Sequence, residues 1–303
     1  MHLISVDDDF QKRGMKLQKT WKDLIYKSDE PCPVIHNEAG LMPYLHYPAL
    51  DQTGIVKNLF TTRLGGVSKG IWESMNVSWS RGDEPEAVRE NFRRAAEAMG
   101  ITPDDIVCTQ QTHTTNVRTV HACDKGKGVT KPLDYQDVDG LITNEKGICL
   151  AAFFADCVPL FFVDPVHHAI GLSHSGWRGT AAQMGAVTLN RMNEEFQTKP
   201  ADTIAAVGPS ICRDCYEVSE DVIDVFRTSY EERYWPELYK EKPGGKYQLD
   251  LWRACVITLL KAGIREENLS VANLCTCCNG ELLFSHRASK GERGNLGAFL
   301  CLI

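Results

Sequence analysis

The sequence of 303 residues lacks several features that would define its class. No stretch approaches the roughly 20 consecutive apolar residues that a membrane-spanning helix needs, so we expect no membrane partner. The N-terminal segment carries charge throughout and contains no apolar stretch of the secretory type. Positive charge is also scarce, since 33 Lys and Arg face 40 Asp and Glu for a net charge of −7. Because nucleic-acid binders gather cationic side chains, we expect no nucleic acid as the main partner, and we expect a cytoplasmic protein.

Histidine is equally scarce. The nine histidines include no His-x-His pair. A multicopper oxidase cluster requires many imidazoles, typically in such pairs, so we do not expect this chemistry. Cu²⁺ can still occupy a smaller site of nitrogen and sulfur ligands, because it binds such ligands tightly.

Cysteine, in contrast, is abundant, with 12 residues. Disulfide scaffolds are typical of short secreted chains, and this chain is long. We therefore expect most of these thiols to be small buried hydrophobic groups, with a few acting as ligands or nucleophiles.

Repeats, low-complexity tracts and Ser/Gly linkers are absent, which favours one domain over residues 36–303 with an appended segment at 1–35. Within that segment the apolar spacing predicts a docked helix, formed by Leu17, Trp21, Leu24 and Ile25.

Helices are predicted at four further places. A capping pattern of Asp83, Pro85 and Glu86 begins one that ends at Gly100. Asp250 caps another that ends at Gly263, and Ser219 begins a shorter one. An apolar stripe predicts the fourth, with Ala182, Ala186, Leu189, Met192 and Phe196.

Continuous apolar runs predict buried strands at residues 148–157, 158–164, 169–177, 203–210 and 297–303. Strands and helices alternate irregularly, without a regular βαβ rhythm. This favours an α+β fold with mixed sheets over a doubly wound fold.

Three side chains stand out as metal ligands. His113 lies in a polar stretch, Cys157 interrupts an intensely apolar double strand, and His174 lies at a strand end before a Gly-rich turn. Asp156 and Cys157 are expensive to bury among such strands unless they are paired or coordinated. Two histidines and one thiolate suit zinc, with a fourth position left for water or substrate. The competing interpretation is a satisfied core histidine and a buried thiol.

Two Gly-rich turns contain arginines suited to anions. Arg178 lies in HSGWRGT and Arg63 in TTRLGGVSKG. Guanidinium groups pair well with phosphate. The alternative is that both are ordinary turns with solvated arginines.

Seven ordered motifs resemble the laccase-domain proteins once called polyphenol oxidases, also known as the YfiH-type purine nucleoside phosphorylase family. They cover roughly residues 45–303 and read FTTRLGGVSKG…SMNVS, QTHTTNV, VDGLIT, ADCVPL, HSGWRGT, GPSICRDCYEV and CTCCNGELLFSHR.

The resemblance implies a layered α/β/β/α fold of mixed sheets, similar to that of a toxin deamidase domain with a Cys-His site. It implies a zinc ion held by His113, Cys157 and His174, the set that the residues themselves indicate. It also implies phosphorolysis of adenosine, inosine and methylthioadenosine, and deamination of adenosine. The expected partners are therefore a purine nucleoside and phosphate, with a homodimer as one expected assembly.

Roles can be fitted to these activities. Deamination needs an acid to protonate the departing ammonia, and Asp156 is the candidate, although neighbours on a strand point to opposite faces. Phosphorolysis needs cationic groups near C1′ of the ribose. The candidate residues for binding substrate or phosphate are Arg63, Arg178, Asn76 and Arg287. We expect Arg63→Ala to weaken phosphorolysis more than deamination.

Three other functions remain open. Cys157 could act as a nucleophile activated by histidine, in a thiol hydrolase that edits a cell-wall precursor. The chain could also be a copper-dependent phenol oxidase. A non-catalytic zinc-binding scaffold is the third alternative.

Three further features bear on metals and phosphate. The cysteines of Cys212-x-x-Cys215 and Cys275-x-Cys277-Cys278 offer a second metal site, a structural zinc site. The gap of 60 residues between them is much longer than the roughly 15–20 residues of the common paired zinc knuckle, which favours the alternative of buried thiols. His167 and His168 are predicted to form a turn. The family commonly ends FFSYRR…TGR, whereas this chain keeps Arg287 but has Ala288 and Gly294-Asn295 at the later arginine positions, with His286 as an extra imidazole.

Overall fold

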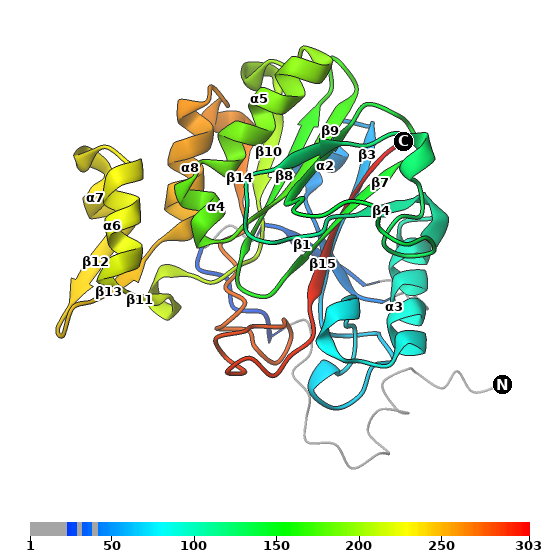
Figure 1. Ribbon diagram of the computed structural model, residues 1–303, viewed down its shortest axis with the longest axis horizontal. Helices are drawn as coiled ribbons and strands as arrows, with labels where there is room; N and C mark the ends of the chain where they lie inside the picture. The colour runs from blue at the N-terminus through cyan, green and yellow to red at the C-terminus, as the bar shows by residue number, and fades with distance from the viewer. Residues whose placement is uncertain (1–22, 29–31, 38–41) are drawn as a thin grey trace.

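Two six-stranded sheets face each other at the centre of the fold (Figure 1). The computed structural model describes residues 23–28, 32–37 and 42–303. In spatial order, the first sheet contains β1 (Val34–His36), β2 (Tyr44–His46), β3 (Val56–Thr61), β15 (Leu296–Leu302), β7 (Cys149–Phe154) and β4 (Ile106–Cys108). The second contains β14 (Leu269–Val271), β10 (Ile204–Val207), β8 (Val158–Asp164), β9 (Ala169–Ser175), β6 (Gly140–Thr143) and β5 (Val117–Thr119).

Both sheets are mixed. The pairs β4/β7, β5/β6 and β10/β14 are parallel, and the other neighbours are antiparallel. The α+β prediction with mixed sheets is confirmed.

Helices cover the outer face of each sheet. On the first sheet, α3 (Pro85–Ala98) packs through Phe92 against Phe299. The second sheet is covered by α4 (Trp177–Ala181), α5 (Met184–Phe196) and α8 (Leu251–Lys261). The layers are therefore α/β/β/α, as the family resemblance implies.

A small lobe projects from the side of the layers, coloured yellow in Figure 1. It contains α6 (Glu220–Ser229), α7 (Trp235–Leu238) and a sheet of β11 (Glu217–Ser219), β13 (Lys246–Leu249) and β12 (Tyr239–Lys242). Outside it, α2 (Pro48–Asp51) precedes β3. Short 3₁₀ helices lie at Gly70–Trp72, Trp79–Arg81, Pro103–Asp105, Ala122–Asp124, Pro200–Asp202, Arg213–Cys215, Glu232–Tyr234 and Glu266–Asn268.

The continuous apolar runs reflect burial on both faces of a strand. In β8, Leu160 and Phe162 pack into the layer under the helices, whereas Phe161 and Val163 pack between the two sheets. Successive side chains of a strand point to opposite faces, so a strand between two apolar layers needs no polar position.

Most of the predicted helices and strands are present. The structure adds three observations about where the predicted helices begin and how they are capped. Asp250 caps α8, since its Oδ1 accepts a hydrogen bond from Arg253 N at 2.9 Å. Asp83 does not cap α3, because its carboxylate accepts from Glu84 N and from the Ser68 hydroxyl instead. The helix predicted from the apolar stripe at Ala182–Phe196 is α5, which begins at Met184, and Ala182 lies between it and the short helix α4.

The N-terminal prediction is partly wrong. Leu17 and Trp21 lie outside the described residues, whereas Leu24 and Ile25 are not helical. This stretch instead lies along the domain, where Tyr26 forms a β-bridge with Leu274. Strand β1 also crosses the expected boundary at residues 35 and 36.

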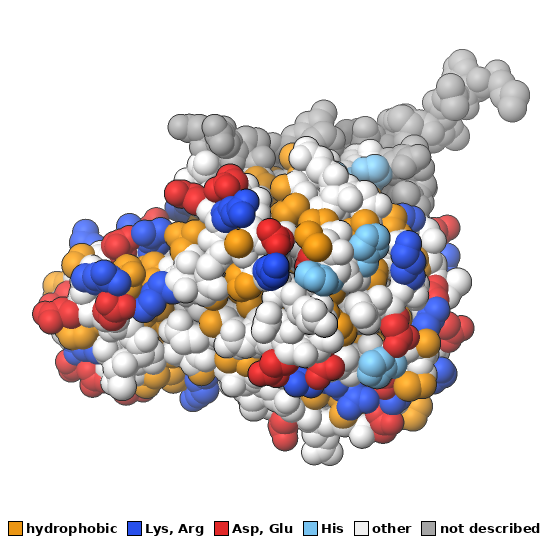
Figure 2. Space-filling view, turned by 90° about the horizontal axis from the view of Figure 1, so that it is seen from above, with side chains coloured by type: hydrophobic (Ala, Val, Ile, Leu, Met, Phe, Trp, Pro, Cys, Tyr) orange, Lys and Arg blue, Asp and Glu red, His pale blue; other side chains and the backbone are white. Residues whose placement is uncertain are grey.

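The turn predicted at His167 and His168 is confirmed, and the imidazole of His167 contacts the Asp164 carboxylate at 2.8 Å. None of the helices in the described ranges is long and apolar enough to cross a membrane. Acidic and basic side chains are interspersed on the face shown in Figure 2.

Candidate metal centre and substrate pocket

His113, Cys157 and His174 converge from three separate segments, which are a loop, a turn and a strand. Cys157 ends the short turn that leads from β7 in one sheet to β8 in the other. His174 lies on β9, opposite Pro159 of β8, and His113 lies in the loop between β4 and β5. Strand pairing therefore places Cys157 beside His174, and the loop brings His113 to them.

The three side chains offer ligand atoms that all lie within 4.8 Å of one another. His113 Nε2 is 3.9 Å from Cys157 Sγ, and the two imidazole rings meet edge to face at 4.9 Å. His174 is 3% exposed, Cys157 is half-buried and His113 is exposed. Two imidazole nitrogens and one sulfur fit a zinc ion, and the exposed side leaves access for a fourth ligand.

Asp139 organises this cluster from behind. Its Oδ1 lies 2.7 Å from His174 Nδ1, so Nε2 is the ring nitrogen left for a metal. The Asp139 side chain is completely buried. A carboxylate that fixes the ring of a ligating histidine is a common feature of metal sites.

The same carboxylate holds the loop of His113. It accepts hydrogen bonds from the backbone N–H groups of Thr112, His113 and Thr114 at 2.9 to 3.1 Å. His113 has a φ of +67°, in the left-handed region that non-glycine residues adopt infrequently. Asp139 therefore supports two of the three candidate ligands.

Gly176 keeps the centre of the cluster open. A Cβ atom at this position would lie 2.7 Å from His113 Cδ2 and 3.2 Å from Cys157 Sγ. These distances are shorter than van der Waals contacts, so only glycine fits between β9 and α4 without displacing a ligand.

The cluster favours a charged sulfur and a charged imidazole. Burial opposes a thiolate at Cys157, but His174 and His113 lower the pKa of this thiol to about 6. Burial likewise opposes a charged His174, but the Cys157 sulfur and the Asp139 carboxylate raise the pKa of this imidazole to about 9. A thiolate is the form of cysteine that binds metals or attacks carbon.

Asp156 has a different environment from the one expected of a proton donor. Its Oδ1 accepts a hydrogen bond from the Thr276 hydroxyl at 2.6 Å, and its Oδ2 accepts one from Arg287 N at 2.7 Å. With a φ of +86°, it directs its carboxylate to the C-terminal loop. These contacts favour a positioning role over the general-acid role expected from the sequence.

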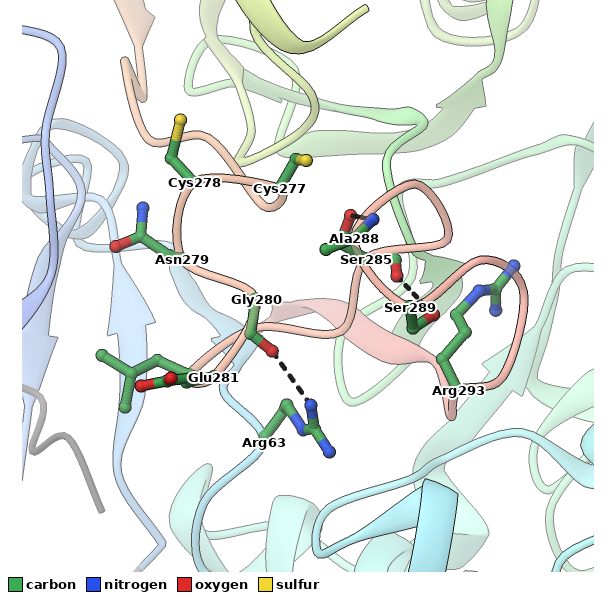
Figure 3. Close-up of a pocket in the computed structure, with 11 residues that line it drawn as sticks. Arg63, Cys277, Cys278, Asn279, Gly280, Glu281, Ser285, Ala288, Ser289 and Arg293 are labelled. Carbon is green, nitrogen blue, oxygen red and sulfur yellow. Dashed lines mark hydrogen bonds between the residues drawn. The ribbon is translucent and has the colours of Figure 1, made fainter. Parts of the chain in front are cut away.

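A cavity with a volume of about 420 Å³ is bounded by Arg63 and by the loop at residues 277–293 (Figure 3). Arg63 and Arg293 line it from different sides. The three candidate ligands do not line this cavity, but Arg293 is within electrostatic range of both Asp156 and Cys157.

Arg293 is the least satisfied cation at this cavity. It is 8% exposed, and its Nε has no hydrogen-bond partner within the described part of the chain. Burial and the neighbouring Arg81 lower the pKa of Arg293 to about 10. A buried guanidinium with a free donor is suited to an anion such as phosphate.

Arg63 is bound more fully by the protein. Its Nε and one terminal nitrogen each donate to a backbone carbonyl at 2.9 Å, those of Glu73 and Gly280, and its guanidinium lies over the Phe284 ring. The turn around it is tight because Gly66 packs against the Ser74 backbone. The interpretation of an ordinary turn therefore accounts for most of this motif.

The other predicted binding residues differ in whether their polar side-chain groups are already bound within the protein. Asn76 is completely buried and its amide is used within the protein, so it is removed from the candidate substrate ligands. Arg287 donates to the carbonyls of Cys215 and Glu217. Arg178 is exposed and stacks on the Trp177 ring.

Three contributors were missed from the sequence. Asp139 lies in the quoted VDGLIT motif directly before a strand, and its complete burial, which marks it as functional, is visible only in the structure. Arg293 lies one residue before the Gly294-Asn295 pair that stands where the family pattern has its later arginine. Tyr216 is half-buried, carries the Arg287 guanidinium over its ring, and lies within electrostatic range of Cys157 and Arg178.

Comparisons with known proteins agree with this architecture. Residues 57–303 match the family model described as multi-copper polyphenol oxidoreductase laccase. A protein named purine nucleoside phosphorylase YlmD from Geobacillus stearothermophilus is 37% identical over 79% of this chain and 88% of its own length. Its namesake from Bacillus subtilis is 36% identical over 80% of this chain and 86% of its own length.

Solved structures show the same fold. The hypothetical protein YfiH of Bacillus licheniformis superposes with a TM-score of 0.83 at 31% identity, covering 89% of this chain and 99% of that one. YlmD from Geobacillus stearothermophilus gives a TM-score of 0.81 at 34% identity, with the same coverage. The chain therefore belongs to the YfiH-type laccase-domain family, in which both bacterial YlmD proteins are named purine nucleoside phosphorylases.

Proposed function

We propose that this protein is a zinc-dependent purine nucleoside phosphorylase that accepts adenosine, inosine and methylthioadenosine and also deaminates adenosine. The main support is the convergence of His113, Cys157 and His174 within electrostatic range of a buried, incompletely bonded Arg293. The names of the bacterial relatives support the same reaction class.

His113, Cys157 and His174 would hold the zinc ion, which supplies a Lewis-acidic centre with one open position. Asp139 keeps the His174 ring oriented with Nε2 toward Cys157 Sγ and holds the Nδ1 proton. Gly176 preserves the space between the ligands.

Phosphorolysis transfers the ribose from the purine nitrogen to phosphate. A phosphate oxygen forms the new bond to C1′, the bond from C1′ to the base nitrogen breaks, and the base nitrogen gains a proton. Arg293 is the proposed anchor for phosphate, because its Nε is free and buried, with Arg63 as a weaker contributor. Desolvated guanidinium groups stabilise phosphate charge strongly.

Tyr216 is the proposed surface for the purine. Its half-buried ring lies within electrostatic range of Cys157 and carries the Arg287 guanidinium 5.4 Å from its centroid. Flat aromatic groups bind heterocyclic bases through stacking.

The direct test is a turnover assay of the purified protein with inosine and phosphate, monitoring hypoxanthine and ribose 1-phosphate. We expect turnover with bound zinc, its loss on chelation, and its loss in His174→Ala. His121→Ala is the matched control, because His121 is exposed and pairs with Glu145. A zinc-loaded protein that leaves all three nucleosides intact would refute the proposal.

One geometric feature favours a second function, a thiol hydrolase. Cys157, His174 and Asp139 form a chain of nucleophile, base and orienting carboxylate. Iodoacetamide distinguishes the two: a metal-free active enzyme inactivated by alkylation at Cys157 supports the hydrolase. Protection of Cys157 by stoichiometric zinc supports the phosphorylase.

A further inference from the structure

A second group of metal-binding side chains lies outside the proposed catalytic centre. The sulfur atoms of Cys212, Cys215, Cys275 and Cys278 all lie within 4.8 Å of one another. We propose that these four thiols bind one structural zinc ion, in a closed tetrahedral site that fixes the wall of the substrate cavity.

The fold explains how two pairs so distant in the sequence meet. Strands β10 and β14 are parallel neighbours, so their following loops leave the sheet at the same edge. The pairing continues beyond the strands: Thr276 N donates to Ser210 O at 3.1 Å, and Ser210 forms a parallel bridge with Cys275. The spacing of roughly 15–20 residues that is typical of a paired zinc knuckle does not apply here, because each pair of cysteines follows its own strand.

The sulfur positions suit one ion better than two disulfides. Four sulfurs at about 2.3 Å from a central zinc lie about 3.8 Å from one another. Cys215 Sγ and Cys278 Sγ are 3.5 Å apart, and all four cysteines are free thiols, whereas a disulfide needs about 2.05 Å. A set of four sulfurs selects zinc or iron among the common metals.

The backbone is also arranged for a charged sulfur. Cys275 Sγ accepts hydrogen bonds from Cys212 N at 3.2 Å and from Cys278 N at 3.4 Å. The ammonium of Lys27, which contacts Asp214 at 3.4 Å, lies within electrostatic range of Cys212 and Cys278. These groups offset the negative charge that four thiolates leave on a divalent ion.

The cluster borders the cavity and the catalytic loop. Thr276 lies between two of the proposed ligands, and its hydroxyl donates to the Asp156 carboxylate next to Cys157. On the other side, Ile211 N donates to the carbonyl of Asp156 at 3.0 Å. Figure 3 shows Cys277 and Cys278 on the wall opposite Arg63. An ion that joins the two loops would therefore hold Asp156 from both sides.

The test is the metal content of the full-length protein purified without chelator. We expect about two zinc ions per wild-type chain, about one in His174→Ala and about one in Cys275→Ser. Cys277→Ser is the matched control, since this cysteine lies in the same loop outside the group of four, and it should keep about two. Metal content is read without any activity assay, so failure here is separate from failure of the proposed reaction.

Two measurements that do not need this variant keep the proposal testable if Cys275→Ser does not fold. After denaturation in chelator, all 12 cysteines of the wild type should react with a thiol reagent, whereas four fewer would react if two disulfides form. Replacement of zinc by Co²⁺ in His174→Ala should give the strong sulfur-to-metal absorption of a four-thiolate site. Four missing thiols, or a His174→Ala protein without metal, would overturn the site, and iron in place of zinc would overturn the choice of ion.

Discussion

The two clusters of potential metal ligands differ in donors, exposure and support. His113, Cys157 and His174 combine nitrogen with sulfur and include one exposed ring, whereas the four cysteines offer sulfur alone. Catalytic zinc sites keep three protein ligands and an open position, and structural sites close with four. The number and exposure of the ligands therefore support the different roles that we propose for the two clusters.

The means of support differ as well. We call the group of His113, Cys157 and His174 the open cluster and the group of four cysteines the closed cluster. A single buried carboxylate, Asp139, orients the open cluster through His174 and the His113 loop. Backbone pairing beyond β10 and β14 orients the closed cluster. Substitutions at the two supports should therefore have separable effects.

The largest separable effect is expected for Asp139→Asn. The amide keeps the size of the side chain but cannot hold the His174 ring and the His113 loop as a carboxylate does. Metal affinity of the open cluster and phosphorolysis should fall by about 10- to 100-fold. The zinc of the four cysteines should remain, as measured by metal analysis. Wild-type kinetics in Asp139→Asn would show that this carboxylate does not support the open cluster, and the proposed difference between the supports of the two clusters would be wrong.

Arg293→Ala tests the anion site beside the open cluster. Loss of a charged hydrogen bond to phosphate costs about 2 kcal/mol, or roughly 30-fold in the KM for phosphate. Adenosine deamination, which uses no phosphate, should change much less. Arg63→Ala is the comparison variant and should have the smaller effect, because two of its donors already bind carbonyls. Equal losses in both reactions would contradict a phosphate role for Arg293.

Gly176→Ala tests the openness of the three-ligand cluster. The added methyl group would contact His113 Cδ2 at 2.7 Å, and overpacking of this kind costs about 1.5 kcal/mol, or roughly tenfold in metal affinity. Gly179→Ala is the control, since its methyl group would lie 3.6 Å from Thr114 O, an ordinary contact. If both variants bind zinc equally, the close approach at Gly176 has no role.

Thr276→Val tests the connection between the clusters. Valine keeps the shape but removes the hydrogen bond to Asp156, which costs about 1 kcal/mol, or roughly fivefold in kcat/KM. The zinc content of both clusters should be unchanged. A loss of metal with intact catalysis would place Thr276 in the closed cluster alone.

The local sequence pattern predicts the buried strands, the mixed-sheet α+β fold and part of the open cluster, whereas the order of the layers is implied by the family resemblance. Strand β8 is apolar throughout because both of its faces are buried, and Cys157 is conspicuous because it follows such a run with a polar neighbour. Asp139 is not conspicuous, since a lone Asp before a strand resembles a turn residue until the strand order is known.

The closed cluster depends on strand pairing that sequence spacing does not encode. Cys212 and Cys275 meet because β10 and β14 are parallel neighbours, a relation between segments far apart in the sequence. Arg293 was missed for a local reason, since it is offset from the Gly294-Asn295 pair that occupies the place of the family arginine. Contacts that depend on long-range pairing need the fold before they can be assigned.

The central claim is that His113, Cys157 and His174 bind a metal ion that phosphorolysis requires. The most direct measurement compares the Cys277→Ser variant with the double variant Cys277→Ser/His174→Ala. Zinc content and inosine phosphorolysis are measured in both proteins. The account predicts about one zinc ion fewer per chain and loss of turnover when His174 is removed. Unchanged zinc content with unchanged turnover would contradict it.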